Sequence, residues 1–248
     1  MLEATRRSER AAGEPRQGSG LDEAKLTSRV PNDTGPGLLS AALARENLLR
    51  ALKQVRANKG AAGVDGLDID QTTKMLRTAW PDIRDSLLKG TYRPRPVRRV
   101  MIPKPGGGER ELGIPTVLDR LIQQALLQVL QPILDPTFSK HSYGFRPGKS
   151  AHEAVLAAQS VVQSGRRIVV DVDLEKFFDR VDHDILIDRL RKKVPDPGVI
   201  RLVRAYLNAD IAEGDVLIKR TRGTPQGGPL VVAMTSVSPM LPVTWARA

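Results

Sequence analysis

The stretch Arg166-Arg-Ile-Val-Val-Asp-Val-Asp-Leu-Glu-Lys-Phe-Phe-Asp179 decides which fold this chain is expected to adopt. Its first half is a short β-branched run bounded by turn-forming residues, which predicts a strand over residues 166–173. Side chains alternate along a strand, so Asp171 and Asp173 are expected to face the same way. Carboxylates at the end of a buried strand are costly unless they are paired or bind a metal, and their hard oxygens suit Mg²⁺. Alternatively, these acids only cap loops, as we expect of Asp182 before the next helix.

Helices are expected on both sides of this strand, because apolar residues recur there at helical spacing. The expected ranges are 39–58, one or two helices between 75 and the glycine at 90, then 117–134, 152–162, 183–192 and 198–208. Asn58 or Gly60 is expected to end the first helix in a left-handed cap. A hairpin turning at 106–108 and a strand over 215–222 complete the pattern. The chain is therefore expected to be an α+β protein.

The composition narrows the class of protein. The 248 residues carry a net charge of +11, with a pI of about 10.2, which favours a polyanionic partner and nucleic acid first. The chain has no cysteine, which excludes disulfides, thiolate zinc sites and cysteine catalysis, and its three histidines lie far apart. No apolar run reaches transmembrane length and no signal segment is recognised, so a cytoplasmic location without membrane contact is expected. Charge alone does not separate an enzyme from a binding protein.

A basic segment lies around the expected hairpin. Residues 89–110 hold seven basic side chains against Glu109 alone, a net charge of +6. Lys104 and Arg110 flank the glycine turn, so a hairpin folded over a triphosphate would present both cations to it. The alternative is a solvated, charged hairpin tip.

Two loops carry further chemistry. Gly223-Thr-Pro-Gln-Gly-Gly-Pro-Leu230 would let the backbone approach a ligand closely, with Gln226 able to donate and accept hydrogen bonds, although an ordinary tight loop has the same composition. Gly144-Phe-Arg-Pro-Gly-Lys-Ser150 has three residues between its glycines, where a phosphate-binding P-loop needs four. Arg146 and Lys149 beside Tyr143 and Phe145 instead suit a nucleic-acid backbone or base.

Seven strings, taken together and in this order, resemble the reverse transcriptases encoded by group II introns, which also serve as maturases. The resemblance runs from about residue 40 to 230. The strings are Asn58-Lys-Gly-Ala-Ala-Gly-Val-Asp-Gly66, Gly90-Thr-Tyr-Arg-Pro94, Ile102-Pro-Lys-Pro-Gly-Gly-Gly-Glu-Arg-Glu-Leu-Gly-Ile-Pro115, Asp119-Arg-Leu-Ile-Gln-Gln124, Ser142-Tyr-Gly-Phe-Arg-Pro147, Asp173-Leu-Glu-Lys-Phe-Phe-Asp179 and Gly223-Thr-Pro-Gln-Gly-Gly-Pro-Leu230.

The resemblance implies the architecture of a right-hand polymerase: fingers and a partial palm behind a helical N-terminal extension. The implied division is the extension over 38–95, fingers over 96–165 and a partial palm over 166–230. The segment around Asn58–Gly66 is similar to the family's N-terminal extension, which contacts template RNA. Residues 1–37 are polar and lack apolar periodicity, so we expect a disordered leader there. After Leu230 the composition changes abruptly, so residues 231–248 are expected to be an aberrant, disordered tail.

The resemblance also implies residue roles. Asp173 resembles the first catalytic aspartate, which with the carbonyl of Leu174 binds two Mg²⁺ ions. Phe178 resembles the gate that excludes the 2′-hydroxyl of a nucleotide. The other implied roles are triphosphate binding by Lys104 and Arg110 and contact with the nascent base pair by Gln226. The charge of the hairpin segment and of the loop beside Tyr143 and Phe145 further predicts RNA binding by Arg98, Arg99, Arg146 and Lys149.

The implied reaction is nucleotidyl transfer. A primer 3′-hydroxyl attacks the α-phosphate of a dNTP and pyrophosphate leaves, with two metal ions stabilising the attacking and leaving oxygens. The implied partners are group II intron RNA, an RNA template with a DNA primer, and dNTPs.

The sequence departs from the family at one point. The family's second and third catalytic aspartates form a Tyr-x-Asp-Asp motif, and these 248 residues hold no Asp-Asp pair. Three hypotheses therefore stay open: a truncated polymerase, an RNA-binding splicing helper without catalysis, and a decayed mobile-element product. On each of them this chain alone is expected not to polymerise DNA.

Overall fold

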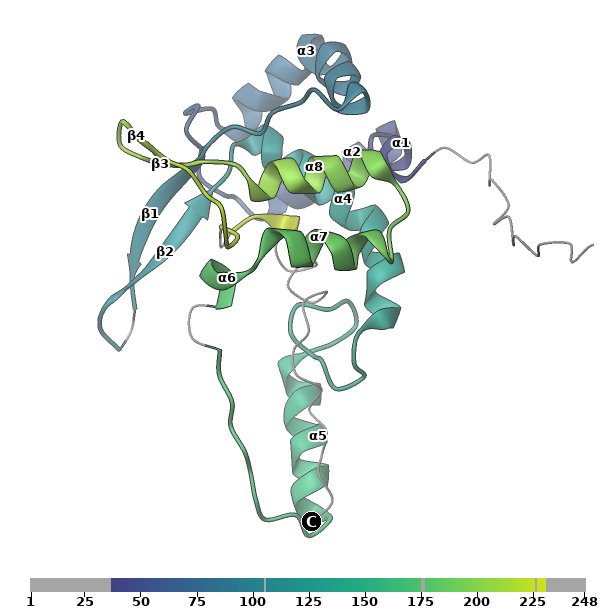
Figure 1. Cartoon of the computed structure of the whole chain (residues 1–248), viewed down its shortest axis with the longest axis vertical. Helices are drawn as coiled ribbons and strands as arrows, with labels where there is room; N and C mark the ends of the chain where they lie inside the picture. Colours follow the sequence, from purple (N-terminus) through teal and green to yellow (C-terminus); the bar gives the residue numbers. More distant parts are fainter. Residues whose placement is uncertain (1–36, 105, 175–176, 226, 231–248) are drawn as a thin grey trace, which may run out of the picture. The chain divides into compact units, whose positions relative to one another are not determined.

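The structure is a computed structural model that describes residues 37–104, 106–174, 177–225 and 227–230 (Figure 1). The expected leader, apart from residue 37, and the expected tail after Leu230 lie outside these ranges. The elements are α1 Leu38–Ala42, α2 Arg45–Ala57, α3 Ile69–Lys89, β1 Val97–Pro103, β2 Glu109–Ile114, α4 Val117–Leu134, the 3₁₀ turn η1 Asp135–Thr137, α5 Ala151–Gln163, α6 Phe177–Arg180, α7 His183–Arg191, α8 Pro197–Leu207, β3 Ile211–Glu213 and β4 Val216–Ile218.

Helix α4 lies at the centre of the hydrophobic core. Its apolar residues cover most of its surface, and Ile122, Leu126 and Leu130 are almost completely buried. They belong to one cluster with residues of α1, α7 and α8, and α2 packs along α4 as well. A helix that is apolar on most sides is stable only when other elements surround it. The predicted buried helix over 117–134 is therefore confirmed at both ends.

The strands form one mixed sheet in the order β2-β1-β3-β4. β1 and β2 pair antiparallel, with Arg98 opposite Ile114 and Ile102 opposite Arg110, which confirms the predicted hairpin. β3 joins β1 in parallel through Val97 and Arg98, and β4 returns antiparallel to β3. The strand predicted over 215–222 is thus much shorter than expected. This sheet fixes the hairpin of β1 and β2 to the segment that follows α8 (Figure 1).

Capping side chains set several helix ends. Asp68 and Gln71 form a capping box at the start of α3, and Gly90 ends that helix with φ +72°. The side chain of Asp182 accepts hydrogen bonds from the backbone N–H groups of Asp184 and Ile185, which confirms its predicted role. These hydrogen bonds lower the pKa of the Asp182 carboxyl, and the bond from Ile185 has the largest effect.

The single helix predicted over 39–58 is wrong, because the chain breaks between α1 and α2. Asn47 explains the break: its side-chain amide donates hydrogen bonds to the carbonyls of Ala42, at 2.8 Å, and Ala125, at 2.9 Å. It therefore satisfies a carbonyl at the end of α1 and ties both helices to α4. The left-handed residue after α2 is Lys59, with φ +46°, whereas Asn58 is right-handed.

The strand predicted over 166–173 is also wrong. Residues 164–174 contain no strand, and Ile168, Val169 and Val170 are 83%, 80% and 81% exposed. A strand requires a neighbour to accept and donate its backbone hydrogen bonds, and in the described ranges no segment pairs with this one. The β-branched composition therefore did not suffice. The preceding helix α5, although correctly predicted, has no buried residue either.

The helices that the structure describes include none that is long and apolar enough to cross a membrane.

Candidate functional site

The loop that starts at Gly223 packs directly on α6. The backbone N–H of Gly223 donates to the carbonyl of Val181, and that of Thr224 to the carbonyl of Phe178, each at 2.8 Å. Gly223 has φ +77°, and a Cβ there would lie 2.8 Å from the carbonyl oxygen of Asp179. A side chain is therefore excluded by both the backbone angle and the space.

The same loop contacts β2 and α4 on its other side. Gly227 has φ +131°, and a Cβ there would collide with the carbonyl oxygen of Gly113 in β2. A Cβ on Gly228 would collide with the side-chain oxygen of Gln123 in α4. Gly113 in turn leaves room for Pro225, since a Cβ on Gly113 would lie 2.7 Å from the Pro225 ring. The loop thus joins the hairpin, the central helix and α6, and Gln226 itself lies outside the described residues.

Two phenylalanines of α6 stand beside this loop. The rings of Phe177 and Phe178 meet edge to face, with centroids 5.6 Å apart. Phe177 packs against the main core cluster, and both side chains are half-buried. Phe178 is therefore supported by its neighbour while its own carbonyl accepts the hydrogen bond from the loop.

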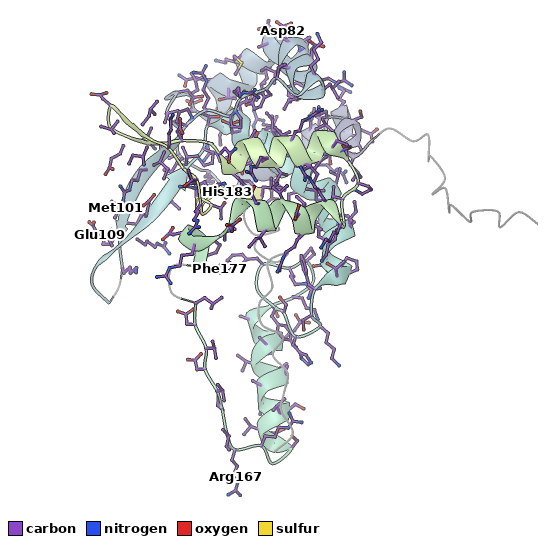
Figure 2. All side chains as sticks on the ribbon, in the orientation of Figure 1. Asp82, Met101, Glu109, Arg167, Phe177 and His183 are labelled. Atoms are coloured by element: carbon purple, nitrogen blue, oxygen red, sulfur yellow. The ribbon has the colours of Figure 1, made fainter. Side chains whose placement is uncertain are left out.

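His183 of α7 holds the loop through a hydrogen bond to the backbone at Gly223. This role was not predicted from the sequence, in which the histidines were considered only as metal ligands. The His183 ring is buried, and Nε2 donates a hydrogen bond of 2.7 Å to the carbonyl of Gly223. Nδ1 lies 3.2 Å from the side-chain oxygen of Asn208 at the end of α8. Figure 2 labels His183 and Phe177 on the neighbouring helices α7 and α6. The histidine thereby links α7, α8 and the loop.

Lys104 and Arg110 lie on the same face of the hairpin. Arg110 is opposite Ile102, and side chains two residues apart along a strand share a face, which places Lys104 with Ile102 and Arg110. The turn closes through the backbone N–H of Lys104, which donates to Gly108 at 2.9 Å. Both cations are exposed, so this face offers two positive charges to solvent.

Arg98 and Arg99, predicted together as RNA-binding residues, lie on opposite faces of β1. Arg98 shares the face of Lys104. Arg99 forms ion pairs with Glu111 of β2, at 3.0 Å, and Glu213 of β3, at 2.7 Å. The hydrogen bond to Glu213, more than any other interaction, raises the pKa of Arg99. The charge of Arg99 is therefore used to hold the sheet together.

Arg146 and Lys149 lie in the loop between η1 and α5. The Arg146 guanidinium is mostly buried, donates to the Asp135 carboxylate at 2.8 Å and 3.1 Å, and lies 5.4 Å from the centroid of the Phe138 ring. The ammonium of Lys149 lies 5.2 Å from the centroid of the Tyr143 ring. Arg146 thus shapes the loop, while Lys149 remains on its surface.

Asp171 and Asp173 lie in the exposed segment before α6. Asp173 accepts a hydrogen bond from the N–H of Leu174 at 2.9 Å. In the part of the chain that the structure describes, no three His, Cys, Asp or Glu side chains come close enough to hold a metal ion. One exposed carboxylate and a neighbouring carbonyl do not fit a two-ion site on their own.

A buried hydrogen-bond network around Asp119 was not foreseen. Only 1% of Asp119 is exposed, and its carboxylate accepts bonds from the hydroxyls of Tyr92, at 2.8 Å, Thr116, at 2.7 Å, and Tyr206, at 3.3 Å. Burial raises the pKa of the Asp119 carboxyl despite these donors. The network joins the segments at Tyr92 and Asp119, both quoted above as motifs, to α8. A lone acid inside an apolar helix was the available signal, because a buried charge must find donors.

Residues 102–238 match the family described as reverse transcriptase (RNA-dependent DNA polymerase). The matched range contains the hairpin tip, α4, α6 and the loop of residues 223–228, called the glycine loop below.

Several relatives match along most of the chain. Protein YkfC of Escherichia coli is 34% identical over 198 residues, which is 77% of this chain and 52% of that protein. The group II intron-encoded protein LtrA of Lactococcus lactis is 36% identical over 188 residues, 75% of this chain and 31% of LtrA. The putative COX1/OXI3 intron 1 protein of Saccharomyces cerevisiae is 29% identical over 209 residues. The chain thus spans about half the length of YkfC and about a third of LtrA.

A solved structure with a similar fold is a chain of a partial Cas6-RT-Cas1–Cas2 complex. Its TM-score is 0.56 at 25% identity, and the match covers 82% of this chain and 34% of that chain.

Proposed function

The chain belongs to the reverse transcriptases encoded by group II introns, and we propose that it forms the part of such an enzyme that holds RNA and the incoming nucleotide. In this proposal residues 96–165 are the fingers and residues 166–230 are part of the palm. The observation that carries it is the glycine loop, which packs β2, α4 and α6 against one another. This packing fixes the base of the hairpin of β1 and β2 relative to α6, the helix that carries Phe178.

The nucleotide is held by the face of Lys104 and Arg110. Arg110 provides a planar fork of donors and Lys104 a point charge, which together neutralise a triphosphate. Phe178 closes the space beneath the sugar, so a 2′-hydroxyl is excluded. Gln226 contacts the nascent base pair.

Asp173 and the carbonyl of Leu174 provide one side of the Mg²⁺ site of the family. Mg²⁺ supplies charge stabilisation to phosphoryl transfer when it is bound. Mg²⁺ gives up its water reluctantly, so a single exposed carboxylate holds it weakly. We therefore propose that the 248-residue chain by itself does not extend a primer.

Primer extension on an RNA template with Mg²⁺ and dNTPs tests this part of the proposal. The unchanged chain should give no more product than its Asp173→Ala variant. Extension clearly above that of the variant would show that Asp173 already works within a complete site.

RNA binding without polymerisation, as in a splicing helper, is the second candidate function. The observation that favours it is the exposed Asp173 segment. Among the described residues, no group of three His, Cys, Asp or Glu side chains that could hold a metal ion forms around Asp173. Both candidates require RNA binding, whose affinity should fall with salt, with a log–log slope of about −0.7 per phosphate contacted on a single strand. A filter-binding series on single-stranded RNA without salt dependence would contradict both.

A further inference from the structure

Phe145 is the most exposed large hydrophobic side chain among those described, with 84% of its surface open to solvent. It lies in the loop of residues 139–150, between η1 and α5. Burial of such a ring is normally favourable, so its exposure calls for a physical reason.

The backbone at Phe145 is strained. Its φ of +55° is left-handed, a conformation that costs a residue with a Cβ and that glycine adopts freely. Lys59 is the other non-glycine residue with positive φ in the described ranges. Gly144 directly precedes Phe145, so swapping these two residues would put a glycine at the left-handed position and avoid the strain. Strain of this kind persists only where the surroundings hold it and concentrates at functional sites.

Arg146 holds the loop in this conformation. Besides the Asp135 carboxylate, its guanidinium donates to the backbone carbonyls of Asp135, at 3.0 Å, Ser139, at 2.7 Å, and Ser142, at 3.1 Å. The next turn closes between the N–H of Lys149 and the carbonyl of Arg146 at 3.2 Å. The residue after Phe145 is therefore fixed from several directions, and the ring is presented on a preorganised loop.

The chemistry of the loop favours a nucleobase over an apolar protein surface. Residues 139–150 contain three cations, Lys140, Arg146 and Lys149, and no carboxylate or aliphatic side chain beyond proline. A protein contact at an exposed Phe needs neighbours that exclude water around it, and this loop supplies only Tyr143, whose ring already lies beside the Lys149 ammonium. Aromatic rings beside cations are the arrangement on which bases of single-stranded nucleic acid stack.

We propose that Phe145 is a stacking platform for an unpaired base of bound RNA, with Lys149 close to the adjoining phosphate. This proposal rests on the proposed function, since it names how the RNA is held at one further point. Arg146 acts as a positioning residue that keeps the platform in place.

The test compares Phe145→Ala, Phe145→Gly and Phe145→Trp in the full chain, using a single-stranded RNA and the same RNA with abasic positions. The Ala and Gly variants lose the ring on which one base stacks, so their affinity for the intact RNA should fall roughly 5- to 150-fold. The slope of affinity against salt should stay unchanged, because the substitutions remove no cation that pairs with a phosphate. Phe145→Trp should retain affinity, and its fluorescence should be quenched by the intact RNA. Ile185→Ala, at a side chain that is 55% exposed on α7 and outside the N-terminal extension, is the matched control.

The stability of Phe145→Gly separates function from folding. Glycine relieves the left-handed strain, so the melting temperature should not fall while affinity does. Unchanged affinity in Phe145→Ala, with RNA binding intact in the parent chain, would overturn the stacking proposal alone. Equal losses on intact and abasic RNA would also overturn it. Failure of the parent chain to bind RNA would overturn the proposed function and this inference together.

Discussion

Two adjacent arginines of β1 show how one residue of register decides what a charge does. Arg98 lies on the basic face of the hairpin with Lys104, whereas Arg99 is held between Glu111 and Glu213. Sequence alone treated them as a pair, because alternation separates their faces only once the strand has formed. The two are therefore expected to respond differently to the same substitution.

We expect Arg98→Ala to flatten the salt dependence of RNA binding by about 0.7 for each phosphate that the arginine neutralises. Arg99→Ala should leave that slope unchanged and instead lower the free energy of unfolding, by about 1 kcal/mol, because its ion pairs are only partly exposed. Filter binding across a salt series and urea denaturation measure the two effects. Similar slopes for both variants would show that Arg99 also binds RNA.

Tyr92 and Tyr206 are expected to make the chain sensitive to alkaline pH. Burial, followed by the negative charge of Asp119, raises the pKa of both hydroxyls. Above about pH 10 the unfolded chain releases these protons while the folded chain keeps them. The unfolded state then binds fewer protons, so stability falls as pH rises, by about 1.4 kcal/mol per pH unit for each tyrosine.

Urea denaturation between pH 9 and 11 checks this expectation. The double variant Tyr92→Phe and Tyr206→Phe should lose stability less steeply over this range than the parent chain. Tyr143→Phe, outside the Asp119 network, is the control and should follow the parent. Parallel curves for the parent and the double variant would mean that the two hydroxyls ionise freely in the folded state.

At the scale of elements, the glycine loop depends on the absence of side chains. Gly223→Ala and Gly227→Ala should each destabilise the chain by more than about 1 kcal/mol. Both positions have positive φ, and the added Cβ would collide with neighbouring backbone atoms. Gly106→Ala is the matched control, since a Cβ there meets nothing within 4 Å. Thermal unfolding measures the three, and equal melting temperatures would show that the loop can move away from α6 and β2.

The contrast between α4 and residues 166–173 shows what sequence patterns determine. The helix was predicted correctly because its hydrogen bonds are internal and its apolar periodicity is local. The strand was wrong because strand formation depends on a distant pairing partner. The glycine loop lies between these cases: its composition predicted close approach, but not that Gly113 and Gln123 would be its neighbours. The sequence likewise signals that Asp119 is a lone acid in an apolar helix, but not which groups donate to it, because the donors come from three separate segments.

At the scale of the whole molecule, the described residues form one main core from two stretches of chain, one up to Leu134 and one from Val181 onward. Leu126 of α4 belongs to the same buried cluster as Leu190 of α7 and Val203 of α8. Between Leu134 and Val181, by contrast, none of the described residues is buried. The intervening stretch, which includes α5 and the exposed segment before α6, contributes no buried residue to that core, and of its described residues only Phe138 and Phe177, near its two ends, pack against it.

Because of this division, the chain should tolerate a break in its backbone between the two stretches that form the core. A nick by trypsin at Arg167, which Figure 2 shows in the exposed segment, would cut the backbone without cutting the core. We expect the two fragments to co-elute in gel filtration and to part only in denaturant, with Arg166→Gln plus Arg167→Gln resisting the cut. Separation without denaturant would contradict this. If the halves stay together, then two separately expressed chains, one ending and one beginning within residues 166–174, should reassemble by complementation.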